Sequence, residues 1–254
     1  MTRTKKRDEP HSRAWLALEQ NLRSVRHMVQ FGAREVRLLH ADVARLSNRV
    51  AKLTKEGKAT PDRLLSQARR LPKRVDARME LFRTATAWQV VLLVTCVETY
   101  LEDILCLAAA ADPRLMASSE QRATYLEILR SASIDELVDE LRARWARKKI
   151  SRGPRRSIEN LSRMGVRFPN DLATRLEPIW GLRHVIVHRA GTATADLVRR
   201  HPDLGAHVGQ RVRVSLKQFG GYVEAARDFL EPTEAFFLKR YPSLSDQAGD
   251  LSVK

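Results

Sequence analysis

The chain has 254 residues, of which 43% are hydrophobic, so it holds enough apolar material for a packed core and is not a wholly disordered protein. Its 46 Lys and Arg residues outnumber its 30 Asp and Glu residues, and the formal net charge of +16 favours a polyanionic partner such as nucleic acid, although scattered arginines also keep a protein soluble. Cys96 and Cys106 are spaced for neither a zinc site nor a redox motif and imply no disulfide framework, which fits a reducing cytoplasm.

The N-terminal part of the sequence predicts a tail and a long helical region. Residues 1–11 are basic and polar, no apolar stretch of the kind found in signal peptides follows them, and we expect a disordered basic tail. Apolar residues then recur every three or four positions, and after Gly32 their spacing is close to heptads. Residues 12–72 are therefore expected to form a helical hairpin or coiled-coil-like region, with a break or kink at Pro72.

The most apolar helix is expected from about Val75 to Ala111, where Asp112-Pro113 would end it. A helix that is apolar almost all round lies at the centre of a fold. Its most hydrophobic run, Val90–Val97, is interrupted by Glu98 and falls far short of the ~20 apolar residues of a membrane span. We therefore expect a buried helix and no membrane partner.

Shorter elements follow. We expect a helix over residues 118–130 and another after Ser133, whose hydroxyl would form a capping box with Glu136. Residues 190–210 are rich in glycine and lack periodicity, which predicts a loop, and Arg211–Val214 could be a short strand or an extended segment.

Two more helices complete the prediction, one from about Asp171 to His188 and one from near Ser215 to just before Pro242. Together these elements predict an all-α fold. A helical bundle over residues 73–240 would follow the N-terminal helical region, and residues 241–254 would form a frayed tail.

A dense basic segment begins within the helix predicted after Ser133 and continues past the end of that helix. It predicts a surface that binds RNA phosphates, although such a run can also be only a solvated basic face. Trp145, inside the segment, could stack on a base or anchor its helix. The residues expected to bind RNA are Arg142, Arg144, Arg147, Lys148, Lys149, Arg155 and Arg156.

The segment richest in chemical information runs from Trp180 to Gly191. Within it, His184 and His188 are one helical turn apart and share a face. Arg183 points about 140° away from His188, but its side chain is long enough to reach the same surface. An imidazole titrates near neutral pH, and a guanidinium binds phosphate in a forked geometry, so this combination is suited to phosphodiester chemistry.

The segment resembles the R-polar-x-x-x-H signature of HEPN domains, the nucleotide-binding domains of higher eukaryotes and prokaryotes. Here the signature reads Arg183-His184-Val-Ile-Val-His188, and Gly191 matches the family's His-x-x-Gly continuation. The run Trp88–Leu105 is similar to the family's earlier core helix, in which an acidic residue, here Glu98, interrupts an apolar stretch. The resemblance is to the RiboL-PSP-like branch, common in bacterial conflict systems, and covers roughly residues 75–239.

The resemblance implies a HEPN-like bundle that forms a homodimer and cleaves single-stranded RNA without a metal or other cofactor. The ribose 2′-hydroxyl would attack, leaving a 2′,3′-cyclic phosphate. His188 is suited to general acid–base catalysis and Arg183 to holding the scissile phosphate. His184 would orient His188 or contact the phosphate, and Glu98 would hydrogen-bond a histidine or Arg183. Such a protein would be a toxin or an antiviral defence effector, with an antitoxin or another defence-system protein as partner.

Each of these residues also has a purely structural interpretation. His188 could stabilise the C-terminal end of its helix, Arg183 could form a surface salt bridge, and Glu98 could be a buried acid paired with any basic residue. His184 and His188 could form a zinc pair, but no third ligand stands out in the sequence. At the level of function, the alternatives are a non-catalytic HEPN module that binds nucleotide or RNA or mediates dimerisation, and a DNA-associated regulatory protein.

Overall fold

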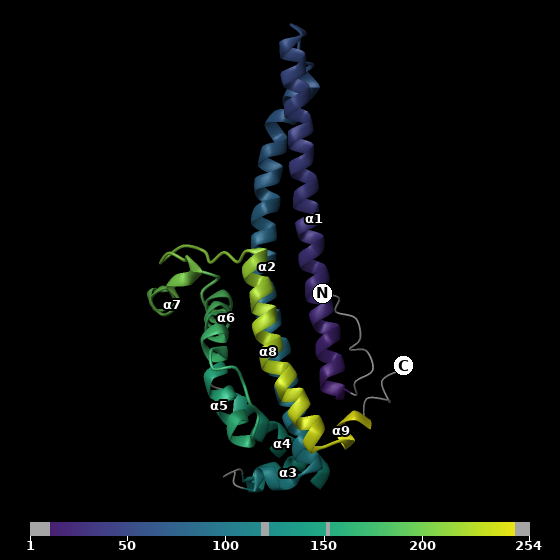
Figure 1. Ribbon diagram of the computed structural model, residues 1–254, viewed down its shortest axis with the longest axis vertical. Helices are drawn as coiled ribbons and strands as arrows, with labels where there is room; N and C mark the ends of the chain where they lie inside the picture. Colours follow the sequence, from purple (N-terminus) through teal and green to yellow (C-terminus); the bar gives the residue numbers. More distant parts are fainter. Residues whose placement is uncertain (1–10, 118–121, 151–152, 247–254) are drawn as a thin grey trace.

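The computed structural model describes residues 11–117, 122–150 and 153–246, and the chain in these ranges has an all-α fold, as predicted. Two long antiparallel helices, α1 and α2, form a hairpin whose far half projects well beyond the shorter helices (Figure 1). The longer elements are α1 (Arg13–Lys55), α2 (Asp62–Ala111), α4 (Ile134–Ile150), α5 (Pro154–Met164), α6 (Leu172–His188) and α8 (Leu216–Arg240). The short ones are η1 (Pro113–Met116), α3 (Tyr125–Arg130), α7 (Ala195–Arg200), η2 (Pro202–Leu204) and α9 (Ser243–Asp246).

In the projecting hairpin, α1 packs against α2 along a seam of apolar residues. The apolar residues of α1 at near-heptad spacing are half-buried, as expected for side chains in a seam between two helices. Gly57 has a φ of +65°, which glycine adopts without strain, and it ends α1 before the turn into α2. The seam residues are Val36, Leu39, Val43, Leu46, Val50 and Leu53.

Of the break or kink expected at Pro72, the break is wrong, because α2 continues through this residue from Asp62 to Ala111. Pro72 lies on the exposed side of α2, where water can satisfy the carbonyl that loses its backbone donor. The boundary expected between residues 72 and 73 therefore falls inside a single helix. The hairpin and the bundle share α2 without an intervening linker.

The first turns of α1 also belong to the bundle. Ser12, which caps α1, donates from its backbone N–H and its hydroxyl to the carboxylate of Glu234 in α8, at 2.6 and 2.8 Å. Tyr100 of α2 donates to the same carboxylate at 2.9 Å. Trp15 is buried here, and His11 stacks on it with ring centroids 5.6 Å apart, so the expected disordered tail does not extend to residue 11; residues 1–10 lie outside the described ranges.

Helix α2 is the centre of the bundle, as its composition predicts. Its side chains Val90, Val94 and Val97 are fully buried, and α4, α6 and α8 pack around it. Trp145 of α4 is only 1% exposed, so it anchors its helix and cannot stack on a base. None of the helices in the described ranges is long and apolar enough to cross a membrane.

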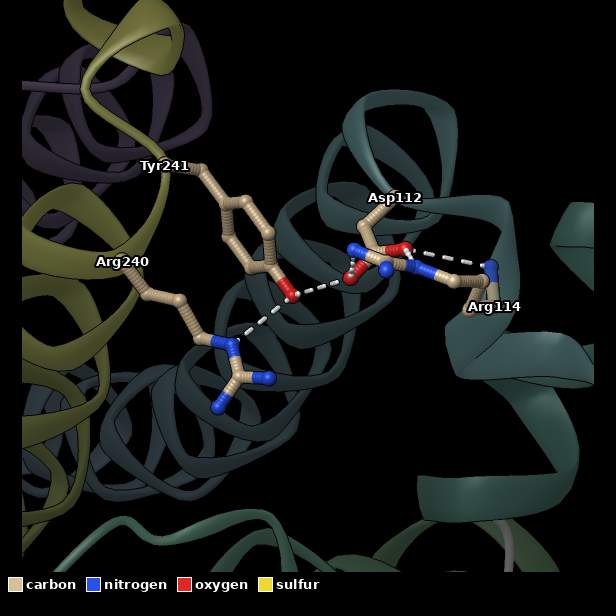
Figure 2. Close-up of polar contacts among 4 residues, drawn as sticks. All are labelled: Asp112, Arg114, Arg240 and Tyr241. Carbon is tan, nitrogen blue, oxygen red and sulfur yellow. Dashed lines mark hydrogen bonds and ion pairs between the residues drawn. The ribbon is translucent and has the colours of Figure 1, made fainter.

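A chain of polar contacts joins the ends of α2 and α8 (Figure 2). Asp112, which follows α2, accepts from the Arg114 guanidinium at 2.8 Å, and these bonds hold the pKa of its carboxyl below the usual range. The Tyr241 hydroxyl lies 3.5 Å from the same carboxylate and accepts a bond from Arg240 at 3.0 Å. These contacts fix the C-terminal end of α8 beside the end of α2.

Three predictions about shorter elements need correction. The expected loop at 190–210 contains α7 and η2, and Arg211 forms an isolated antiparallel bridge with Thr192, not a strand. The expected helix over 118–130 is shorter, because residues 122–124 are not helical and α3 begins at Tyr125; residues 118–121 lie outside the described ranges. The expected frayed tail contains α9, whose Leu244 is buried in the core; residues 247–254 are not described.

Candidate functional site

Helix α6 carries the candidate motif and runs antiparallel to α2 along the side of the bundle (Figure 1). It is anchored by buried apolar residues that include Leu182, Val185 and Ile186, which alternate with the motif residues. Gly181 lets α7 approach closely, since a Cβ at this position would lie 2.9 Å from Cδ1 of Leu197. The helix is therefore fixed on its inner side and presents the motif on its outer side.

The two histidines form a pair on the surface. His184 and His188 are both exposed, and their ring centroids lie 4.9 Å apart at an interplanar angle of 48°. Neither has a carboxylate partner among the described residues. His188 is the last residue of α6. Both imidazole rings are therefore accessible to a bound molecule.

A tight turn directly after His188 holds the end of the helix. The backbone N–H groups of Arg189 and Gly191 both donate to the Val185 carbonyl at 2.9 Å. Ala190 and Gly191 have φ values of +49° and +76°, so the turn needs two successive left-handed residues, and glycine at the second avoids strain. The geometry of this turn thus explains why a glycine stands at the last position of the His-x-x-Gly stretch.

Arg183 lies beside the histidines but is more enclosed. Its side chain is half-buried, and its Nε is buried without a hydrogen-bond partner among the described residues. A buried guanidinium N–H without an acceptor is costly, and a bound anion would supply one. This is the feature of Arg183 that a surface salt bridge does not explain, and no ion pair involving it is found in the described ranges.

Glu98 contacts neither histidine nor Arg183. Its Oε1 accepts a hydrogen bond from the indole N–H of Trp180 at 3.0 Å, so the expected direct contact is replaced by one through α6. Trp180 is one turn before His184 on the same helix. Glu98 therefore holds the face of α6 that carries the histidines, and Trp180 is a positioning residue. The spacing of residues 180, 184 and 188, one helical turn apart, is the sequence signal that could have identified Trp180.

A hollow of about 630 Å³ adjoins the end of α6. Trp88 of α2 lines it and is half exposed, although the sequence places it in an apolar run. Arginines from both sides also line it, and one of them, Arg213, has no ion-pair partner in the described part of the chain. Sequence reasoning missed this hollow because residues 80–88 and 210–213 come together only in the folded chain. The other lining residues include Glu80, Arg83, Gln210 and Arg211.

The predicted RNA-binding segment is largely engaged in ion pairs within the chain. The segment spans the end of α4 and the start of α5, below the motif in Figure 1. Lys148 is exposed without an ion-pair partner in the described ranges, and Lys149 lies over the Trp145 ring at 5.9 Å. The five arginines of the segment form ion pairs: Arg142 with Asp139, Arg144 with Glu127, Arg147 with Glu102, Arg155 with Glu177 and Arg156 with Glu159.

In the described ranges, no group of three or more His, Cys, Asp or Glu side chains is arranged to hold a metal ion. Compared with protein-family models, with curated proteins and with solved structures, the chain gives no match. What is defined at this point is an all-α protein with an exposed histidine pair, a partly enclosed arginine and an adjoining hollow lined by basic and aromatic residues.

Proposed function

We propose that the protein is a metal-independent endoribonuclease that cleaves single-stranded RNA. The observation that carries the proposal is the pair of exposed imidazoles at the end of α6, next to an arginine whose buried Nε lacks an acceptor. Imidazole groups supply a proton acceptor and donor near neutral pH, and guanidinium supplies a permanent positive charge for a phosphate. Phosphodiester cleavage through the ribose 2′-hydroxyl requires these two functions.

The proposed reaction assigns a role to each group. His188, in its neutral form, takes the proton of the 2′-hydroxyl while the 2′-oxygen forms a bond to phosphorus. The P–O5′ bond breaks, a protonated imidazole gives its proton to the leaving 5′-oxygen, and the products are a 2′,3′-cyclic phosphate and a 5′-hydroxyl. Arg183 stabilises the negative charge on the phosphoryl oxygens, and His184 orients His188 or contacts the phosphate. Glu98 acts through Trp180 and is a positioning residue.

A homodimer is part of the proposal. The packed helices α2 and α6 both carry exposed apolar side chains, Trp88 and Leu92 on α2 and Val187 within the motif of α6. Such side chains are suited to the centre of an interface. A second copy would place another histidine pair opposite the first and supply the general acid. In a cell, a cytoplasmic toxin or defence effector with a restraining antitoxin partner would fit this activity.

The second candidate is a non-catalytic module that binds nucleotide or RNA. The observation that favours it is that the hollow beside α6 is lined by Ile186, Ala190 and Gly191 but by neither histidine. A nucleotide in this hollow would lie next to the motif without necessarily reaching the imidazoles. Trp88 would stack on its base and Arg213 would bind its phosphate.

Purified protein incubated with single-stranded RNA, with and without excess chelator, separates the two candidates. We expect cleavage in both conditions, and a loss of about 10²–10⁴-fold in His188→Ala, since a placed proton-transfer group contributes that much. Arg183→Ala should lose a comparable factor. His40→Ala removes an exposed histidine from the distant part of α1 and should cleave like wild type. Undiminished cleavage by His188→Ala, or cleavage abolished by chelator, would reject the proposed chemistry.

A further inference from the structure

The projecting part of the hairpin contains a concentration of arginines. Arg45 and Arg49 are four residues apart on α1, and Arg70 and Arg74 are four residues apart on α2. All four line a single hollow of about 610 Å³ between the two helices. Half-buried leucines, Leu46, Leu64 and Leu71, also line it, together with Gln67 and Asp42. We name this feature the arginine groove.

Most of the charge in the arginine groove is not neutralised. Arg45 pairs with Asp42, but Arg49, Arg70 and Arg74 have no ion-pair partner in the described ranges. Like charges four residues apart on a helix repel one another, and here two such pairs face each other across the seam. The arrangement therefore costs stability in the free protein. An anion between the helices would remove that repulsion.

The contrast with the basic segment of α4 and α5 indicates where a polyanion would bind. There, five arginines have a carboxylate partner within the chain, whereas three of the four arginines in the groove have none. A phosphate that binds a paired arginine must compete with that carboxylate, but one that binds a free arginine need not. Of these two basic regions, the hairpin therefore offers more arginines that are free to bind a phosphate.

The groove lies in line with the candidate site. Both are connected by the uninterrupted helix α2, on which Arg74 precedes Trp88 by 14 residues, or about 21 Å at 1.5 Å per residue. A few nucleotides cover that distance. One RNA strand is therefore long enough to lie in the groove and reach the hollow beside α6.

We propose that the arginine groove binds the phosphate backbone of the RNA substrate and directs the strand toward the end of α6. The identity of the ligand as substrate rests on the proposed function, but its binding does not depend on cleavage. Each phosphate contact on a single strand contributes about 0.7 to the log–log salt slope. Three unpaired arginines thus account for a log–log salt slope of about 2. That slope corresponds to about 100-fold higher affinity at 0.1 M than at 1 M salt.

The test measures binding of 2′-O-methyl RNA, which lacks the attacking hydroxyl and cannot be cleaved by the proposed route. The groove variant is Arg49→Gln/Arg70→Gln/Arg74→Gln. The matched control is Arg63→Gln/Arg69→Gln/Arg78→Gln, which removes three exposed arginines from the same hairpin outside the groove. Because both variants lose the same charge, any difference between them belongs to the position of the arginines.

We expect the groove variant to lose about 100-fold in affinity and about 2 from the salt slope, and the control to lose much less. A conservative variant, Arg49→Lys/Arg70→Lys/Arg74→Lys, should keep most of the slope. The groove variant should melt at the same or a higher temperature than wild type, because repulsion is relieved. If the melting temperature of the groove variant falls, the arginines stabilise the hairpin. The affinity and salt slope of the lysine variant are then compared with those of wild type and the control variant.

Equal losses in the groove and control variants would overturn the proposal in favour of diffuse attraction, and so would an unchanged affinity in both. Stronger groove-dependent binding of duplex DNA than of RNA would overturn it in favour of a DNA partner. The outcome is independent of cleavage. If RNA binding depends on the groove but the wild-type protein does not cleave, the ribonuclease proposal is rejected and the groove proposal stands. If the protein cleaves RNA but binding does not depend on the groove, the groove proposal is rejected and the ribonuclease proposal stands.

Discussion

The hydrogen bonds between Ser12 and Glu234 make a stability prediction that can be worked out from the structure. In Ser12→Ala, α1 loses its N-cap, because the Ser12 hydroxyl accepts from the Trp15 backbone N–H at 3.2 Å. The variant also loses the 2.8 Å bond from the same hydroxyl to the buried Glu234 carboxylate. The backbone N–H of residue 12 still donates to that carboxylate, so one of the two bonds survives.

The expected magnitude is the sum of these two losses. An N-cap serine contributes about 1 kcal/mol. A hydrogen bond to a charged group contributes about 1.5–3 kcal/mol. Ser12→Ala should therefore lower the free energy of unfolding by about 2.5–4 kcal/mol. The loss will be toward the upper end if water cannot reach Glu234, whose exposed fraction is only 4%.

Ser215→Ala is the matched control. Ser215 caps α8 in the same way, accepting from the Gln218 backbone N–H at 3.2 Å, but it is exposed and has no carboxylate partner among the described residues. It should cost about 1 kcal/mol. Urea denaturation followed by helical circular dichroism measures both. If Ser12→Ala is no more destabilising than Ser215→Ala, the bond to Glu234 contributes nothing and the reasoning is refuted; in a Glu234→Ala background the two variants should cost the same.

Two further predictions concern titration. Burial, together with the carboxylates of Glu102 and Asp103, raises the pKa of Cys106 to about 11, so in Cys96→Ala its alkylation by iodoacetamide at pH 8 should be about 100-fold slower than that of free cysteine; an equal rate would contradict the burial of this thiol. The Thr124 backbone N–H, assisted by Arg144, lowers the pKa of Glu127 to about 2 from 4.5. Its charge therefore stabilises the fold above pH 4.5, and this contribution is lost as pH falls through about 2. The melting temperatures of wild type and Glu127→Gln should accordingly converge between pH 4.5 and 2, and a constant difference would show that Glu127 does not act through its charge.

Much of the fold could be predicted because its long helices obey local rules. Apolar periodicity located α1, Asp112-Pro113 located the end of α2, and Ser215 located the start of α8. Helix α7 was missed because a six-residue helix is too short to show a period. Pro72 does not end its helix, because it faces solvent and water can satisfy the carbonyl that loses its backbone donor.

The candidate site was predictable only where its residues are neighbours in sequence. His184 and His188 share a face because of helical spacing, and the structure brings their rings together. The contact of Glu98 with Trp180 joins residues 82 positions apart, and the contact of Ser12 with Glu234 joins residues 222 apart, so no local pattern indicates either. The arginine groove was hidden for the same reason, since i, i+4 arginines on one helix resemble any solvated face until the second helix is placed against them.

The continuity of α2 through Pro72 gives the hairpin the properties of a ruler. Because the seam between α1 and α2 repeats at near-heptad spacing, seven residues added to each helix between the bundle and the arginine groove would keep every face in register. Each such addition would move the groove about 10.5 Å farther from α6, at 1.5 Å per residue. The length of the hairpin would then determine the distance along an RNA strand between the site where the strand is held and the site where it is cut. That distance could be changed one heptad at a time.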